Sequence, residues 1–205
     1  MINYPHKKNT QTTNQGLCEN NKKAVDFGRR GMSFEDQIVK ANDYYLTSGL
    51  AVIHKKPTPV QIVKVDYPSR SAARITEAYF KMPSTTDFNG VYKGIYIDFE
   101  AKETTNKTTF PLANIHAHQV QHIIAVAKQK GFAFLLVKFS ILNEIYLLKS
   151  DTLQRFWKEY EKGERKSIKR EEFIVHGIQV LNNTYPSVDY LKVIDHLLKE
   201  GGCLK

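Results

Sequence analysis

Asp87-Phe-Asn-Gly-Val-Tyr-Lys-Gly-Ile-Tyr-Ile-Asp-Phe-Glu-Ala-Lys102 is the stretch that decides the fold of this chain. It predicts an acidic residue, then a β-hairpin whose second strand ends in Glu-x-Lys. Residues i and i+2 of a strand point the same way, so Glu100 and Lys102 share a face that Asp87 can reach. Two carboxylates can hold a divalent cation, and a neighbouring ammonium can stabilise charge at a phosphate. The stretch therefore favours metal-dependent cleavage of a phosphodiester.

The second strand of this hairpin alternates in character, which indicates burial on one side and a site on the other. Its apolar face is expected to carry Ile95, Ile97, Phe99 and Ala101. Its polar face is expected to carry Tyr96, Asp98, Glu100 and Lys102. Asp98 either supports the site or is merely solvated. The alternative for the whole stretch is a solvated hairpin with ordinary surface charges.

Composition predicts one domain with a polyanionic partner. The chain has 205 residues, 41% of them hydrophobic, and a formal net charge of +9. Such a charge favours nucleic acid or an anionic membrane surface. No apolar run is long enough to span a membrane, and the polar N-terminus does not resemble a signal peptide. Cys18 and Cys203 are expected to be free thiols in a reducing cytosol. We therefore expect a cytoplasmic, nucleoid-associated protein.

The first 31 residues differ from the rest. Residues 1–27 are rich in Asn, Gln, Thr and Lys and predict a disordered basic tail, which either touches nucleic acid or only aids solubility. Gly28-Arg-Arg-Gly31 follows as a basic hinge. We expect the folded domain over residues 28–205. Its first helix should begin after Ser33, whose hydroxyl suits a capping box, and run to about Thr47.

A long insertion separates the first strand from the hairpin. We expect a buried strand at Leu50–Ile53, then a basic segment with strand character, then a short helix at Ala72–Phe80. A connection of about residues 56–82 is unusually long for a loop, and such segments are commonly functional or disordered. Its apolar residues argue against disorder, so we interpret it as a protruding arm.

The remaining elements complete a mixed α/β domain. In chain order we expect a polar loop at 103–114, a helix at 116–130, strands at 132–139 and 144–148, a helix capped by Asp151, a charged solvated stretch at 158–170, and a final helix capped by Asp189 and ending near Lys199. This order predicts a mixed central sheet flanked by helices, with the arm inserted between strands.

These residues together resemble the PD-(D/E)XK nuclease superfamily and, within it, the RecU family of Holliday junction resolvases. The finer match lies in Gly31-Met-Ser-Phe-Glu35, His54-Lys-Lys-Pro-Thr-Pro59, Val65-Asp-Tyr-Pro68, Ser84-Thr-Thr-Asp87 and Phe99-Glu-Ala-Lys-Glu103. The similarity runs from about Gly28 to the last helix. Thr86 stands where the superfamily has its namesake proline, which removes no ligand.

The resemblance implies a restriction-endonuclease-like fold and a Mg²⁺ site, with Mn²⁺ able to substitute. The implied ligands are Thr85, Asp87, Glu100 and Gln119, while Lys102 would stabilise the transition state or orient water. Glu35 is either a further catalytic carboxylate or a charge that compensates the helix N-terminus. Three histidines, His116, His118 and His122, could suggest a metal, but they lack a clear third ligand.

The resemblance also implies partners. It implies a homodimer that cuts four-way DNA on two opposed strands in recombination and repair, with a recombinase or branch-migration machinery as a further partner and no membrane. We expect DNA contacts from Arg29, Arg30, Lys55, Lys56, Tyr67, Arg70 and Arg74. Two other hypotheses stay open: a non-catalytic protein that binds junctions or anneals strands, and a sequence-specific restriction-type nuclease.

Overall fold

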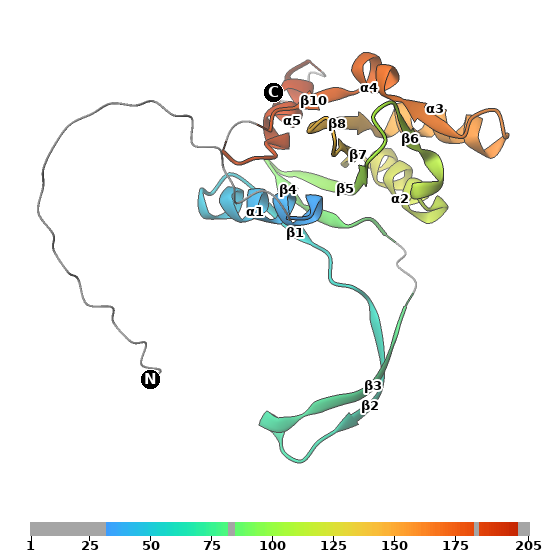
Figure 1. Ribbon diagram of the computed structural model, residues 1–205. Helices are drawn as coiled ribbons and strands as arrows, with labels where there is room; N and C mark the ends of the chain where they lie inside the picture. Colours follow the sequence, from blue (N-terminus) through green and yellow to red (C-terminus); the bar gives the residue numbers. More distant parts are fainter. Residues whose placement is uncertain (1–31, 82–84, 183–184, 201–205) are drawn as a thin grey trace, which may run out of the picture. The chain divides into compact units, whose positions relative to one another are not determined.

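The core of the fold is a six-stranded sheet that includes both strands of the predicted hairpin (Figure 1). The computed structural model of the protein describes residues 32–81, 85–182 and 185–200, so the expected tail, Arg29 and Arg30 lie outside the described residues. In spatial order the strands are β1 (Val52–Lys55), β4 (Phe88–Tyr92), β5 (Ile95–Thr104), β7 (Phe132–Phe139), β8 (Glu144–Lys149) and β10 (Ile178–Val180). Neighbours are antiparallel except β5 and β7, which are parallel.

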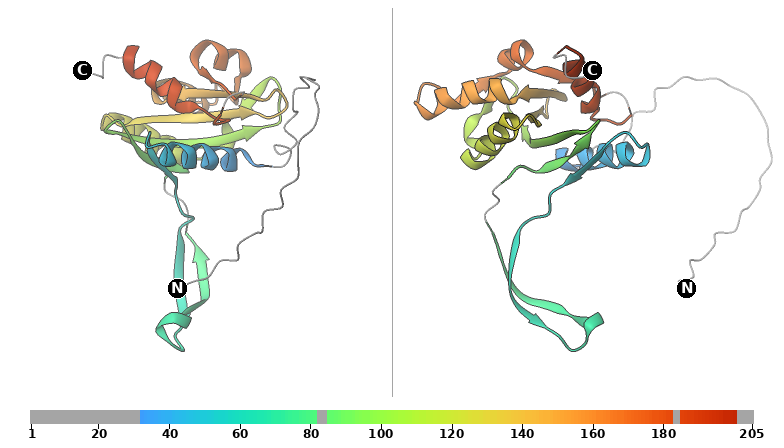
Figure 2. Two further views of the ribbon diagram at one scale, coloured as in Figure 1. Left: turned by 90° about the vertical axis from the view of Figure 1, so that its left-hand side faces the viewer. Right: turned by 180° about the vertical axis from the view of Figure 1, so that it is seen from behind.

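Helices cover both faces of this sheet, as the two views of Figure 2 show. One face packs against α1 (Phe34–Thr47) and α5 (Tyr190–Glu200). The other packs against α2 (Ala117–Lys128), α3 (Ser150–Glu161) and α4 (Arg170–His176). The crossover through α2 is what allows β5 and β7 to run parallel. The predicted mixed sheet flanked by helices is confirmed.

Helix α1 begins and ends where the sequence predicts. The Ser33 hydroxyl accepts a hydrogen bond from the Asp36 backbone N–H at 3.1 Å, which satisfies a free donor of the first turn. Ile38 and Tyr45 lie on its buried face. Gly49 follows with φ +66°, a left-handed conformation that suits glycine and ends the helix.

A two-residue turn joins β4 to β5. Lys93 and Gly94 both have positive φ, 49° and 77°, as a tight hairpin turn requires. The resulting register pairs Phe88 with Phe99 across the two strands. Gly90 lets β1 approach β4, because a Cβ there would lie 2.0 Å from the Val52 carbonyl oxygen.

The arm is a β-hairpin. Strands β2 (Val60–Asp66) and β3 (Arg74–Phe80) are antiparallel and form a two-stranded sheet of their own, joined by a short 3-10 turn, η2 (Arg70–Ala72). Nearly all their side chains are exposed, including Phe80 at 84%. The helix expected at Ala72–Phe80 is therefore wrong, because pairing with β2 selects the extended form for a segment rich in β-branched and aromatic residues.

The first strand is shifted relative to its prediction. Leu50 precedes β1 and is half exposed, as is Val52, whereas Ile53 is buried. The strand lies at the edge of the sheet, and of its four residues only Ile53 is buried, so the buried strand expected at Leu50–Ile53 is shifted toward Lys55 and mostly exposed.

Two expected polar segments contain short structured elements. Residues 109–114 form β6 (Thr109–Pro111) and a 3-10 turn, η3 (Leu112–Asn114), rather than a loop. Strand β9 (Ser167–Lys169) pairs with β6 and buries Ile168 inside the segment expected to be solvated. Elements of three residues are too short to show a sequence period.

The helix after β8 begins two residues earlier than expected. Its N-cap is Lys149, and Asp151 lies in the first turn, where its charge favours the helix N-terminus. Across the described residues, none of the helices combines the length and apolar character needed to cross a membrane.

Candidate active site

The polar face of β5 carries the candidate site. The pairing of Phe88 with Phe99 places Asp87 opposite Glu100. On the reverse face, the ring of Phe99 stacks between Phe88 and Phe134, with centroid distances of 4.9 and 4.7 Å. This ladder of rings packs three adjacent strands together directly behind the two carboxylates, so their backbone positions are firmly held.

Glu100 is completely buried, yet one of its oxygens lacks a partner. Its Oε1 atom lies 2.5 Å from Lys102 Nζ and accepts a hydrogen bond from Gln119 Nε2 at 2.7 Å. Its Oε2 atom has no hydrogen-bond partner among the described residues. A buried carboxylate oxygen without a partner is costly, so the site is built to receive a further group.

The charges around Glu100 also favour the binding of a further group. Burial and, after it, the negative charge of Asp87 raise its pKa from the ordinary 4.5 to about 8. Lys102 opposes both effects. A carboxylate whose charge is disfavoured by burial and by a neighbouring carboxylate is stabilised by a cation bound between the two.

Asp87 is only half-buried and lies between Glu100 and a cavity. Its Oδ2 atom accepts a hydrogen bond from the Ala101 backbone N–H at 3.4 Å. The carboxylate also lines a cavity of about 310 Å³, which we name the basal cleft. Its lining residues are Glu35, Lys55, Lys56, Pro57, Thr58, Pro59, Thr85, Thr86 and Asp87. The cleft therefore leaves Asp87 accessible to solvent.

Asp87 and Glu100 fit a divalent metal of the hard, oxygen-binding kind. Within the described ranges no three His, Cys, Asp or Glu side chains form a metal-binding group, so further ligands would have to be other oxygens. Thr85 lies on the wall of the basal cleft beside Asp87, and its hydroxyl makes one long hydrogen bond, 3.5 Å, to the Thr86 carbonyl. That hydroxyl therefore remains a candidate ligand.

Gln119 is placed next to Glu100 but does not present its amide oxygen to it. The oxygen accepts a hydrogen bond from the His116 backbone N–H at 3.0 Å, while the amide nitrogen donates to Glu100. The expected orientation of the oxygen toward a cation differs from this arrangement, because Gln119 also caps the N-terminus of α2. In this structure Gln119 holds Glu100 in place.

Glu35 lies on the basal cleft as an ion-pair partner of Lys55. The hydrogen bond to Glu35 raises the pKa of Lys55, and the charges of Asp87 and Asp36 act in the same direction. Lys55 is therefore a firmly charged ammonium beside the carboxylates, suited to a DNA phosphate. Glu35 orients this lysine, a role that the sequence did not suggest.

The other expected DNA contacts are distributed differently. Tyr67, at 71% exposure, and Arg74 are open on the arm, as binding would require. The side chain of Arg70 lies outside the described residues. Lys56 is turned inward and pairs with Asp98 at 2.8 Å, so it is a structural cation rather than a free one.

The three histidines do not converge on one point. The rings of His116 and His118 stack with centroids 5.5 Å apart, whereas His122 contacts Asp98. Asp98, which the sequence left open, is completely buried beneath Lys56 and Thr86. Thr86 itself was not proposed as a site residue; its place immediately before Asp87 was the available signal.

The raised pKa of Glu100 predicts how stability depends on pH. Between about 4.5 and about 8 the folded, metal-free protein holds a proton that the unfolded chain has released. This group therefore lowers the free energy of unfolding as pH rises through that range. A Mg²⁺ ion held by Glu100 would need its carboxylate deprotonated, so stabilisation by added Mg²⁺ is expected to increase with pH.

Melting temperatures in EDTA and in Mg²⁺, at pH of about 5.5 and about 8.5, test this sign. The Glu100→Gln variant serves as the matched control, because it cannot titrate at this position. Equal stabilisation by Mg²⁺ at both pH values would contradict the prediction.

Comparisons with known proteins agree with one another. The family model described as "Recombination protein U" (RecU) matches residues 29–196. A Staphylococcus carnosus protein named "Holliday junction resolvase RecU" is 52% identical over 200 residues, which cover 96% of each chain. A Bacillus thuringiensis protein of the same name is 50% identical over 194 residues, covering 95% of this chain and 96% of the relative.

Similarity to a solved structure is much weaker. Hjc of Archaeoglobus fulgidus, a Holliday junction resolvase from an archaeal hyperthermophile, aligns over 68% of this chain and 93% of its own, with 11% identity and a TM-score of 0.38. A likeness at this level supports no conclusion. The family match and the near full-length relatives do: this chain belongs to the recombination protein U family.

Proposed function

We propose that this protein is a Mg²⁺-dependent endonuclease that cuts Holliday (four-way) DNA junctions during recombination and repair. The observation that carries the proposal is the buried Glu100, with one oxygen free, set opposite Asp87 and beside Lys102. The relatives named Holliday junction resolvase support the substrate class. The basic charge of the chain, +9, suits a nucleic acid.

The chain's own residues have separate tasks in this proposal. Asp87 and Glu100 would hold the metal, which supplies Lewis-acid activation of the phosphate and of water. Lys102 would donate a hydrogen bond to a phosphate oxygen and stabilise the charge that develops there. Lys55, held by Glu35 at the basal cleft, would position the backbone of the cleaved strand.

The reaction is a hydrolysis. The oxygen of water bonds to phosphorus, the bond from phosphorus to the 3′ oxygen breaks, and that oxygen receives a proton. The products are a 5′-phosphate and a 3′-hydroxyl. Resolution of a junction needs two opposed cuts, so we propose a two-fold symmetric homodimer with one site in each chain.

A direct test compares a labelled four-way junction with a linear duplex of matched sequence, in Mg²⁺ and in EDTA. We expect paired nicks in the junction alone, only with Mg²⁺, and products that DNA ligase reseals without prior phosphorylation. Asp87→Asn should retain binding and lower the cleavage rate by about a thousandfold, since a metal ligand contributes several kcal/mol to the barrier.

Other outcomes would contradict the proposal. Tight binding of the junction without cuts in any divalent metal would indicate a junction-binding protein instead. Equal cleavage of the linear duplex would indicate a nuclease without structural selectivity. Ends that ligase cannot reseal would exclude the stated products.

A further inference from the structure

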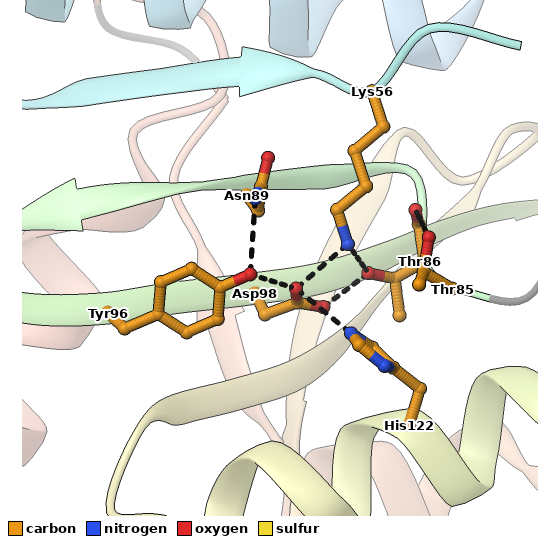
Figure 3. A network of polar contacts seen from close by, with 7 residues as sticks. All are labelled: Lys56, Thr85, Thr86, Asn89, Tyr96, Asp98 and His122. Atoms are coloured by element: carbon orange, nitrogen blue, oxygen red, sulfur yellow. Dashed lines mark hydrogen bonds and ion pairs between the residues drawn. The ribbon is translucent and has the colours of Figure 1, made fainter.

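Asp98 is a completely buried carboxylate that binds four different side chains (Figure 3). Its Oδ2 atom accepts hydrogen bonds from Lys56 Nζ at 2.8 Å and from the Tyr96 hydroxyl at 2.9 Å, and lies 3.2 Å from His122 Nε2. Its Oδ1 atom accepts from the Thr86 hydroxyl. Both oxygens are thus occupied, in contrast to Glu100 two residues later.

Two of these partners are the two ends of the arm. Lys56 follows β1, where the chain leaves the sheet, and Thr86 lies where the chain returns, one residue before Asp87. The two ends also contact each other. Lys56 Nζ donates to Thr86 Oγ1 at 2.9 Å, and the Lys56 backbone N–H donates to the Asp87 carbonyl at 2.7 Å. Asp98 therefore closes a ring at the base of the arm, which we name the clasp.

The third partner links the clasp to α2. His122 lies on this helix one turn after Gln119, and Gln119 donates a hydrogen bond to Glu100. Asp98 therefore contacts the segment that carries Asp87 and the helix that holds Glu100. Because Asp98 contacts both of these elements, it is suited to fixing the position of Asp87 relative to Glu100.

Stability alone does not explain the choice of a carboxylate here. The Lys56 ammonium lies 2.8 Å from one oxygen of Asp98, and the Thr86 hydroxyl donates to the other. Asp98 and Lys56 thus form an ion pair whose carboxylate is completely buried. Apolar side chains of similar size often stabilise such a position as well as a buried ion pair does, so the pair is better explained by the geometry it imposes.

We propose that Asp98 is a positioning residue: it clasps both ends of the arm to β5 and thereby sets the position of the Asp87 carboxylate relative to Glu100. The role in cleavage rests on the proposed nuclease function, whereas the clasp itself does not. Release of Thr86 would move its neighbour Asp87, while Glu100 would stay fixed by the pairing of β5 with β7.

The Asp98→Asn variant of the full chain tests this inference. Asparagine keeps one acceptor but replaces the other with an N–H group, which cannot accept from Lys56. Without DNA, hydrogen exchange of the Lys56 backbone amide should become about tenfold faster or more, because local opening of the clasp is easier. Exchange of the amides shared by β5 and β7 should not change.

Cleavage supplies the second measurement. We expect kcat to fall about a hundredfold, as for a misplacement of about 1 Å at a reacting centre, with little change in KM for the junction. The Mg²⁺ concentration that gives half the maximal rate should rise. A residue with a merely structural role would leave that concentration unchanged.

Two further variants keep the inference open to refutation. Tyr96→Phe removes a hydrogen bond from the same carboxylate without touching the arm, so Lys56 exchange and cleavage should stay within about twofold of the wild type. Thr86→Val removes the other tie to the arm and replaces Asp98→Asn if that variant does not fold.

The outcomes separate the clasp from the nuclease function. Unchanged Lys56 exchange in both Asp98→Asn and Thr86→Val would overturn the clasp, even if the wild type cuts junctions. Faster exchange with an unchanged kcat would overturn the positioning role. Absence of cleavage by the wild type would instead refute the proposed function, and the exchange result would still decide the clasp.

Discussion

Replacing Glu100 with glutamine is expected to abolish junction cleavage and, at the same time, to make the metal-free protein more stable. We expect a loss of cleavage of about a thousandfold or more, equivalent to several kcal/mol of the barrier. In EDTA at neutral to alkaline pH we expect the free energy of unfolding to rise by about 2 kcal/mol, or roughly 5 °C in Tm. The two effects have opposite signs for one physical reason.

The reason lies in the two oxygens of Glu100. The amide oxygen of glutamine can still accept from Lys102 and Gln119, as Oε1 does now. Its amide nitrogen would take the place of Oε2, which has no partner among the described residues, and could donate to Asp87. At neutral pH the glutamine replaces a carboxyl that must take up a proton on folding, and above a pH of about 8 it replaces a repulsive pair of carboxylates with a hydrogen-bonded pair. In either range the variant can no longer hold a cation between the two side chains. Sites that bind charged groups commonly sacrifice stability in this way.

Thermal unfolding in EDTA and single-turnover cleavage in Mg²⁺ measure the two effects. Glu103→Gln is a matched control, because Glu103 is an exposed carboxylate on the opposite face of the same strand. Its cleavage rate should stay within about threefold of the wild type, without a rise in Tm. A lower Tm for Glu100→Gln would show that Lys102 stabilises the carboxylate more than burial and Asp87 destabilise it.

Removal of the arm is expected to abolish the preference for junctions while leaving the fold intact. A variant in which a short glycine turn replaces residues 61–80 should lose about a hundredfold in affinity for a four-way junction, the scale of one or two stacked bases and their phosphate contacts. Binding of linear duplex should change far less. Proposed contacts include Tyr67 with unstacked bases and Arg74 with phosphates, both of them exposed.

Bulk charge cannot produce this result. The deleted residues hold three cations, Lys64, Arg70 and Arg74, and two anions, Asp66 and Glu77, so the net change is one unit of the total +9. Lys128→Ser removes the same net charge from the end of α2 and should leave the preference unchanged. The core is also spared, since β2 and β3 bury almost nothing.

Competition binding with junction and duplex at several salt concentrations measures the preference. The Tm of the deletion variant should remain close to that of the wild type, as the clasp residues Lys56 and Thr86 are retained. An unchanged ratio of junction to duplex affinity would show that the arm does not recognise the junction.

Local pattern was enough to predict five of the six strands of the sheet, all except β10, and to place Asp87 opposite Glu100. Alternation along β5 separated its faces correctly, because one side of that strand is covered by apolar residues and the other is not. The same reasoning failed at β3, since an arm without a core imposes no period on its side chains. A helix was therefore as consistent with residues 72–80 as a strand.

Contacts between residues far apart in the chain could not be predicted from the sequence. The bond between Lys56 and Asp98 joins residues 42 apart, and nothing local distinguishes Lys56 from the exposed Lys55. The orientation of Gln119 depends on a backbone N–H at the start of α2, so spacing could not reveal which amide atom faces Glu100. Both the inward turn of Lys56 and the orientation of Gln119 depend on how distant parts of the chain pack together.

The two-residue turn at Lys93 and Gly94 also bears on how the chain folds. Because it joins β4 to β5 directly, it makes the Asp87–Glu100 pairing one of the most local in the sheet, and hairpins of this kind form within about 1–10 μs. The contact between Lys56 and Thr86 at the base of the arm closes a loop of about thirty residues, which costs more conformational entropy. The two carboxylates are thus expected to meet early, before Lys56 arrives, and a divalent cation present during refolding should speed the step that brings them together.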